Sequence, residues 1–333
     1  MEAEVTTQTE KRSIWQSDAF QILAAFSALI AMFIFFSFAS PYFMQFSNIV
    51  GILLATSVNG ILALGATFVI ISGGIDLSVG TVMTLSAVMT GVFITNLGLP
   101  VPIGILGGLA TGALAGLVNG TVIAKMKIPP FIATLGMLYM AKGLALVISD
   151  LKPIYFTDAP NFSQVAMGSV TGRIIPGFDI PNAVLIFFGA ALVANFILNR
   201  TVLGRYTFAL GSNEEATRLS GVNVDIWKMA VYMLAGTFAG LAGVVIAARL
   251  NSAQPALGAG YELDAIAAVV IGGTSLSGGE GTIMGTVIGA FVISVLTNGL
   301  RIMSVPQEWQ IVITGAIVIL AVYADTLRKS RQA

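Results

Sequence analysis

Residues 49–71 read IVGILLATSVNGILALGATFVII, and residues 72–80 continue as SGGIDLSVG. A helix needs about 20 mostly apolar residues to cross the hydrocarbon core of a bilayer, and the first stretch meets that length without a charge. The second stretch interrupts the apolar run with three glycines and Asp76. Because glycine favours turns over helix interiors, we expect a membrane-spanning helix that ends in a break.

The composition of the chain extends this prediction to the whole molecule. Of 333 residues, 56% are hydrophobic and 10% are charged, whereas soluble domains carry about 25% charged residues. A soluble globule cannot bury so much apolar surface, so we expect much of it to contact the lipid bilayer. The absence of histidine and cysteine removes the usual general base and the commonest metal ligands. These features predict a membrane protein and argue against an enzyme.

The chain has equal numbers of basic and acidic residues, 16 of each. It therefore lacks the excess of basic residues that is typical of proteins that bind nucleic acid. The distribution of the basic residues carries more information, because loops rich in Lys and Arg stay in the cytoplasm. Eleven of the 16 fall on the side of the N-terminus, four fall on the other side, and Lys142 lies within an apolar segment. We therefore expect both termini to be cytoplasmic.

Ten apolar segments are candidates for membrane spans, and two of them, 77–94 and 263–279, are interrupted by glycine. The ten are 19–39, 49–71, 77–94, 101–124, 128–148, 182–198, 229–247, 263–279, 282–300 and 310–323. The predicted fold is an all-α polytopic membrane protein with about ten transmembrane helices, fewer if the weakest segment is re-entrant.

The predicted organisation is a cytoplasmic tail at 1–18, one transmembrane domain at 19–325 and a basic cytoplasmic tail at 326–333. The outer loop at 150–181 contains four prolines, so we expect it to be ordered by turns rather than by helix. The inner loop at 199–228 is the main polar segment on the cytoplasmic side. The chain lacks a G-x-x-x-x-G-K-[ST] phosphate loop, so ATP chemistry would need another chain.

The break at 73–80 has a counterpart near the other end of the chain. Residues 73–80 read GGIDLSVG, residues 272–279 read GGTSLSGG, and both fit GGxxLSxG. Paired breaks in related halves are the best sequence pointer to a transport pathway. For Asp76, capping the next helix is the simpler interpretation, and a direct role at the pathway or gate is the alternative. The candidates in the breaks are Gly73, Gly74, Asp76, Ser78, Gly80, Gly272 and Gly273.

Four polar residues within or next to apolar segments complete the candidate pathway set. Glu262 and Asp264 open an apolar segment near the outer face, where acids are candidates for function. Helix capping is again the simpler interpretation, with Arg249 as a partner. Asn59 and Asn298 would either bond neighbouring helices or line a path.

Glycines recur at helical spacing in three segments, and we expect them to pack helices closely. They are Gly104, Gly108, Gly112, Gly116 and Gly120, then Gly236 and Gly240, then Gly281, Gly285 and Gly289. In the inner loop, residues 212–215 read SNEE, which fits a capping box starting at Ser212, and Gly221 fits a position just beyond a helix end. These signals predict one short cytoplasmic helix, which could also be no more than a solvated turn.

Three blocks of this sequence resemble the permeases of bacterial ABC transporters for ribose and related monosaccharides, and are most similar to ribose permeases. The first is 72–80. The second is 204–223, GRYTFALGSNEEATRLSGVN. The third runs from SAQP at 252–255 through GYELDAIAAVV at 260–270 to GGTSL at 272–276. The resemblance covers residues 20–325, although Ser212 and Glu215 stand where the family has Gly and Ala.

The resemblance implies a multi-pass permease subunit of the bacterial inner membrane that passes sugar from a periplasmic binding protein to the cytoplasm. Its partners would be a cytoplasmic ATPase, the sugar-binding protein and a second permease, either an identical copy or a related one. ATP and Mg would bind the ATPase, and this chain would bind no cofactor. The implied ATPase-coupling residues are Ser212, Asn213, Glu214, Glu215, Arg218 and Gly221.

An ion-coupled secondary transporter or channel for a small polar solute is the alternative, because it would share the same hydropathy and broken helices. Neighbouring genes for an ATPase and a secreted binding protein would favour the importer. Sugar movement in vesicles on an ion gradient without ATP would favour the alternative.

Overall fold

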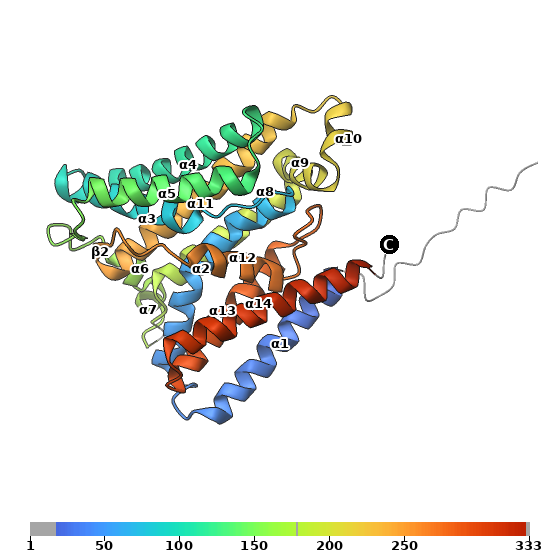
Figure 1. Ribbon diagram of the computed structural model, residues 1–333. Helices are drawn as coiled ribbons and strands as arrows, with labels where there is room; N and C mark the ends of the chain where they lie inside the picture. The colour runs from blue at the N-terminus through green and yellow to red at the C-terminus, as the bar shows by residue number, and fades with distance from the viewer. Residues whose placement is uncertain (1–17, 178, 331–333) are drawn as a thin grey trace, which may run out of the picture.

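The computed structural model describes residues 18–177 and 179–330, which form a predominantly helical bundle (Figure 1). Within these residues, eight helices are long and apolar enough to cross a membrane. They are α1 (Asp18–Ala39), α2 (Phe46–Ile71), α3 (Val79–Gly91, extended by a π-helical turn at Val92–Asn96), α4 (Val101–Lys125), α5 (Pro130–Ile148), α8 (Asn182–Arg200), α11 (Val224–Leu250) and α13 (Ile283–Ile302). The prediction of an all-α polytopic membrane protein is confirmed.

The other two predicted spans differ from this pattern. The segment 263–279 holds α12 (Tyr261–Ile271), whose 11 residues span only about 16 Å before the glycines end the helix. The segment 310–323 lies within α14 (Gln307–Ser330), a helix of 24 residues whose apolar part runs over Gln307–Leu320. The helix within 263–279 is therefore too short to span the membrane by itself, and the total of about ten spans stays a prediction.

Four helices form the centre of the bundle. Between 61% and 72% of the residues in the spans of α2, α3, α11 and α13 are buried, against 11% in α1 and 22% in α5. The peripheral α1 presents apolar side chains outward, such as Phe38, as a lipid-facing helix does. The predicted glycine stripe of α4 lies against α11, where a Cβ on Gly112 or Gly236 would overlap the other residue's backbone. The stripes of α4 and α11 thus serve close helix packing, as predicted. Gly285 and Gly289 of α13 likewise meet the backbone at the end of α12, whereas Gly281 precedes α13 and lies outside the helix.

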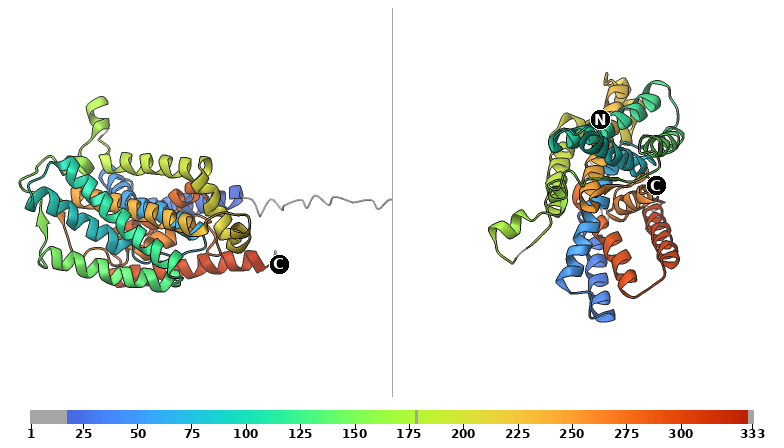
Figure 2. Two further views of the ribbon diagram at one scale, coloured as in Figure 1. Left: turned by 90° about the horizontal axis from the view of Figure 1, so that it is seen from above. Right: turned by 90° about the vertical axis from the view of Figure 1, so that its left-hand side faces the viewer.

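The two ends of the bundle carry different connections (Figures 1 and 2). One end holds α9 (Val202–Ser212) and α10 (Glu214–Leu219), together with the start of α1 and the end of α14. The opposite end holds β1 (Ile154–Tyr155), α6 (Gln164–Met167) and α7 (Val170–Ile174), and β1 pairs antiparallel with β2 (Ser252–Ala253). Both ends of the described chain therefore share a side with the predicted inner loop.

The expectation of an outer loop without helix is wrong, because α6 and α7 form single turns there. Ser169 provides a local reason, since its side chain accepts a hydrogen bond from the Gly172 N–H and caps α7. The outermost parts of the predicted tails, 1–17 and 331–333, lie outside the described residues. Which face is cytoplasmic stays a prediction.

Candidate functional site

The two glycine-rich breaks begin with the same helix cap. Gly73 and Gly273 adopt left-handed backbone conformations, with φ of 78° and 91°. In both caps this glycine donates its N–H to the carbonyl three residues earlier, and the next residue, Gly74 or Thr274, donates to the carbonyl five residues earlier. This hydrogen-bond pattern is the Schellman motif. The sequence repeat therefore corresponds to a repeated backbone structure.

The first break is attached to two neighbouring helices. The buried Asp76 accepts hydrogen bonds from the N–H and Oγ of Ser78, at 2.8 and 2.6 Å. Asn119 Nδ2 on α4 donates to Ser78 Oγ at 2.9 Å, and the Tyr232 hydroxyl on α11 donates to the Ile75 carbonyl at 3.3 Å. Asp76 is thus not the N-cap of α3, a position that Ser78 occupies. It instead orders the turn before α3 and ties that turn to α4.

Two glycines in and beside this break allow close contacts that other residues would block. A Cβ on Gly74 would overlap the Tyr232 hydroxyl. A Cβ on Gly80 would overlap the Gly258 carbonyl and the Glu262 carboxylate. Gly80 therefore lets α3 approach the start of α12 closely.

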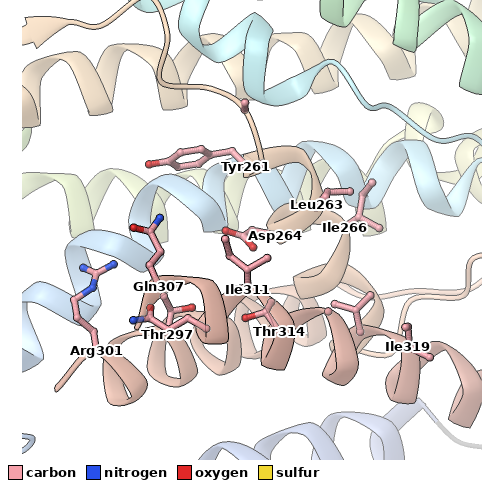
Figure 3. Close-up of a pocket in the computed structure, with 15 residues that line it drawn as sticks. Tyr261, Leu263, Asp264, Ile266, Thr297, Arg301, Gln307, Ile311, Thr314 and Ile319 are labelled. Atoms are coloured by element: carbon pink, nitrogen blue, oxygen red, sulfur yellow. The ribbon is translucent and has the colours of Figure 1, made fainter. Parts of the chain in front are cut away.

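The two outer acids have different environments. The Glu262 carboxylate accepts the Gly260 N–H at 3.1 and 3.2 Å, so it caps its own helix. Asp264 has no side-chain hydrogen bond or ion pair within the described residues and lines a cavity instead (Figure 3). Arg249 pairs with neither acid, because its guanidinium donates to the Leu54 carbonyl at 3.3 Å. The capping interpretation is therefore correct for Glu262 and not for Asp264.

The cavity lies between α12, α13 and α14 and has a volume of about 710 Å³. Its polar lining residues are Tyr261, Asp264, Thr297, Arg301, Gln307, Gln310 and Thr314. Sequence reasoning found only Asp264 among these side chains. The spacing of 297 and 301, and of 310 and 314, places each pair on one helix face and could have indicated a polar stripe within apolar helices.

The two candidate asparagines have separate positions. Asn298 Nδ2 on α13 donates to Asn48 Oδ1 on α2 at 2.9 Å, so it bonds neighbouring helices. Asn59 lies in the middle of α2, and its buried Oδ1 has no hydrogen-bond donor within the described residues. The structure does not bring the two asparagines together with the breaks into one cluster.

At the end of the bundle that carries α10, three segments meet through glycine. The Gly279 N–H, in the loop between α12 and α13, donates to the Ile71 carbonyl at the end of α2, at 2.8 Å. A Cβ on Gly211, near the end of α9, would overlap both of these backbones. A Cβ on Gly278 would come within 3.0 Å of Gly211 and Gly73. We call Gly73, Gly211, Gly278 and Gly279 the glycine junction. Sequence reasoning did not predict it.

The predicted short helix exists, although its N-terminus differs from the prediction. Asn213, not Ser212, is the N-cap of α10, and its Oδ1 accepts the Ala216 N–H at 2.9 Å. The capping box at 212–215 is therefore wrong, because Ser212 is the last residue of α9. Gly221 has a φ of 86° just beyond the helix, as predicted. The six residues of α10 are about 9 Å long.

A network of charges fixes α10 to its neighbours. Glu214 pairs with Arg218 at 3.0 Å and with Lys228 on α11 at 2.6 Å. Asp225 pairs with Lys127, in the turn between α4 and α5, at 2.8 Å. Burial would raise the pKa of Glu214, but hydrogen bonds and charges from Lys228 and Arg218 lower it below its usual value.

Two side chains of α10 remain available on its surface. Glu215 is exposed and has no hydrogen bond or ion pair within the described residues. Leu219 is 82% exposed, which is unusual for leucine at a polar end of the molecule. Sequence reasoning named Glu215 and missed Leu219.

A bundle of spanning helices with paired breaks and a charged helix at one end has the architecture of a polytopic transporter. A family model described as "Branched-chain amino acid transport system / permease component" matches residues 48–322. The chain belongs to this permease family. It is a multi-pass protein of the inner membrane, and it is a transport subunit rather than an enzyme.

Curated relatives match over nearly their full length. The chain is 41% identical to the ribose import permease protein RbsC of Escherichia coli K12 over 305 residues, covering 91% of this chain and 92% of the relative. It is 40% identical to RbsC of Bacillus subtilis 168, covering 96% and 97%. It is 34% identical to the xylose transport system permease protein XylH of E. coli K12, covering 93% of each. No solved structure matches the chain.

Proposed function

We propose that this chain is the permease subunit of an ATP-driven importer for ribose or a related monosaccharide. It receives sugar from a periplasmic binding protein and releases it to the cytoplasm. Support comes from relatives named for ribose and xylose and from spans with few charges, which suit a neutral polyol. A second permease, identical or related, completes the pathway, while ATP and Mg bind a separate ATPase.

The glycine junction is the observation that carries the coupling part of this proposal. Because α10 directly follows α9, a shift of α10 moves Gly211, which contacts the ends of both broken regions. We assign α10 as the helix that docks on the ATPase, with Glu215 and Leu219 as its docking side chains. A backbone contact without intervening side chains transmits displacement with little slack, since packed interiors are dense and stiff.

The same geometry suggests how access alternates. The break at 72–78 is held by Asn119 and Tyr232, and the loop after α12 is held by Ile71. Movement at the junction would reposition both broken regions together. We therefore propose that Gly73, Gly74, Asp76, Ser78, Gly80, Gly272 and Gly273 form the moving part of the pathway.

The test is reconstitution of the chain with its ATPase and its binding protein in proteoliposomes. We expect radiolabelled ribose or xylose to accumulate only when ATP and Mg reach the ATPase. A matched control uses an ATPase whose phosphate-loop lysine is replaced by alanine, which should abolish uptake. Accumulation on a proton or sodium gradient without ATP would instead identify a secondary transporter.

A further inference from the structure

The cavity between α12, α13 and α14 collects polar side chains with unused hydrogen-bonding capacity (Figure 3). Within the described residues, the side chains of Tyr261, Asp264, Arg301, Gln307 and Thr314 make no hydrogen bond or ion pair with other side chains or with the backbone. By contrast, Thr67 and Thr111 bond the carbonyl four residues earlier in their helices. Tyr261, Asp264 and Thr314 are partly buried there. Because partly buried polar groups without partners are unfavourable, the cavity favours an occupant that supplies hydrogen-bond partners.

The chemistry of the lining selects the kind of occupant. One carboxylate, one guanidinium, one amide and two hydroxyls offer both acceptors and donors, and the charges of Asp264 and Arg301 cancel formally. Such a set suits a neutral molecule with several hydroxyl groups better than a cation or an anion. Leu263, Ile266 and Ile311 also line the cavity (Figure 3). Its volume lies within the range of about 300–1,000 Å³ that small-molecule sites occupy.

The position of the cavity links it to the moving part of the molecule. Tyr261 and Asp264 lie in the first turn of α12, and the other end of α12 is the cap at Gly272 and Gly273. The loop that follows reaches the glycine junction. An occupant bound at the start of α12 therefore contacts a helix whose other end is connected, through the loop and the glycine junction, to α9 and α10.

We propose that this cavity binds the monosaccharide during transport. Asp264 accepts hydrogen bonds from sugar hydroxyls, while Arg301 and Gln307 donate to them. The ring of Tyr261 flanks the sugar. This inference rests on the proposed function and adds a substrate site within the permease itself, formed by residues of a single chain.

The absence of cysteine in the chain makes a direct test possible. Thr314→Cys places one thiol in the cavity, and Asn161→Cys places one in the exposed outer loop as a control. Each full-length variant is assembled with its ATPase in nanodiscs and labelled with a small maleimide, with or without D-ribose or D-xylose. At ten times the Kd, occupancy should slow labelling of Thr314→Cys about tenfold and leave Asn161→Cys unchanged.

A second substitution tests the assigned contact. Asp264→Asn in the Thr314→Cys background should raise the half-protecting sugar concentration about tenfold, because hydrogen bonds to charged groups are stronger than neutral ones. Asp158→Asn, in the outer loop, is the matched acidic control and should leave that concentration unchanged. If Thr314→Cys fails to assemble, Thr297→Cys on α13 replaces it.

The outcomes separate this site from the function it rests on. The proposed sugar site is contradicted if neither sugar slows the labelling, or if the thiol is unreactive without sugar. This holds even when ATP-driven uptake is normal. Equal protection in the parent and in Asp264→Asn overturns the role of Asp264. Protection without ATP-driven uptake supports the site and contradicts the proposed importer.

Discussion

At the scale of single residues, the glycines of this protein differ in what surrounds them. Gly74 faces the Tyr232 hydroxyl at a distance that leaves no room for a side chain, whereas Gly136 on α5 has no neighbour within reach of a Cβ. Both are glycines in or next to apolar segments, and composition does not distinguish them. Their substitution therefore provides a matched pair.

Gly74→Leu should reduce uptake about tenfold or more, because extra atoms in a packed core cost about 1–3 kcal/mol and here displace Tyr232 from the Ile75 carbonyl. Gly136→Leu should transport normally. Uptake is measured in proteoliposomes at equal amounts of inserted protein. Normal transport by Gly74→Leu would remove the close approach at this break from the mechanism.

At the scale of elements, α10 combines a fixed side and a free side. Glu214 and Arg218 belong to the charge network with Lys228 and Asp225, while Glu215 and Leu219 are exposed and take no part in it. Helices of two turns are not stable alone in water. The network therefore explains how so short a helix can remain rigid enough to dock on a partner.

Leu219→Ser and Glu215→Lys should weaken binding of the ATPase without disturbing the fold of α10. Burial of the exposed Leu219 side chain on docking would contribute about 1.5–3 kcal/mol, so the ATPase should copurify poorly with Leu219→Ser. Arg218→Glu is a structural contrast, since it places a negative charge beside Glu214 and Asp225. Normal copurification and normal sugar-stimulated ATP hydrolysis in both variants would contradict α10 as the docking surface. The turn at Lys127 would then be the next candidate.

The pKa of Glu214 predicts how α10 responds to pH. Because its folded value is lowered, its ion pairs stabilise the helix above the usual value of 4.5 and are lost as the pH falls through the lower, folded pKa. Trp227, which contacts Tyr206 near the network, is a reporter after Trp15→Phe and Trp309→Phe. Its fluorescence should stay constant from pH 8 to 5 and change only below about pH 4.5. Glu214→Gln should show the altered signal already at pH 7, and a transition near neutral pH would contradict this assignment.

At the scale of the whole molecule, the glycine junction brings together α2, α9 and the loop after α12. Each contact is made by backbone, so its geometry cannot adjust by rotating a side chain. Under the proposed function, the junction lies between α10, which would bind the ATPase, and the two breaks. A substitution at the junction should therefore affect transport and leave ATPase binding intact.

Gly211→Ala tests this separation. Its Cβ would overlap the Ile71 carbonyl and the Gly279 N–H, so the ends of the two broken regions must move apart. We expect the ATPase to copurify normally while uptake falls at least about tenfold, in line with an overpacking cost of about 1–3 kcal/mol. Gly189→Ala on α8, where a Cβ has open space, is the control. Tight coupling between ATP hydrolysis and uptake in Gly211→Ala would show that displacement reaches the breaks by another route.

The amino-acid sequence by itself determined the fold class, most of the spans, the repeated breaks and the short helix before Gly221. These features depend on apolar length, on the backbone freedom of glycine and on local capping, which all act between near neighbours in the chain. The repeat GGxxLSxG could be read for the same reason, since both copies form similar local turns.

Only the tertiary structure decided which of these features meet. Glu262 and Asp264 are two residues apart, yet one caps α12 and the other lines a cavity built with α13 and α14. The N-cap of α10 shifted from Ser212 to Asn213 because α9 continues through Ser212. Gly73, Gly211 and Gly278 are distant in sequence, and their contact depends on how whole helices pack. Packing joins surfaces through shape and excluded volume, and no local pattern in the chain encodes that pairing.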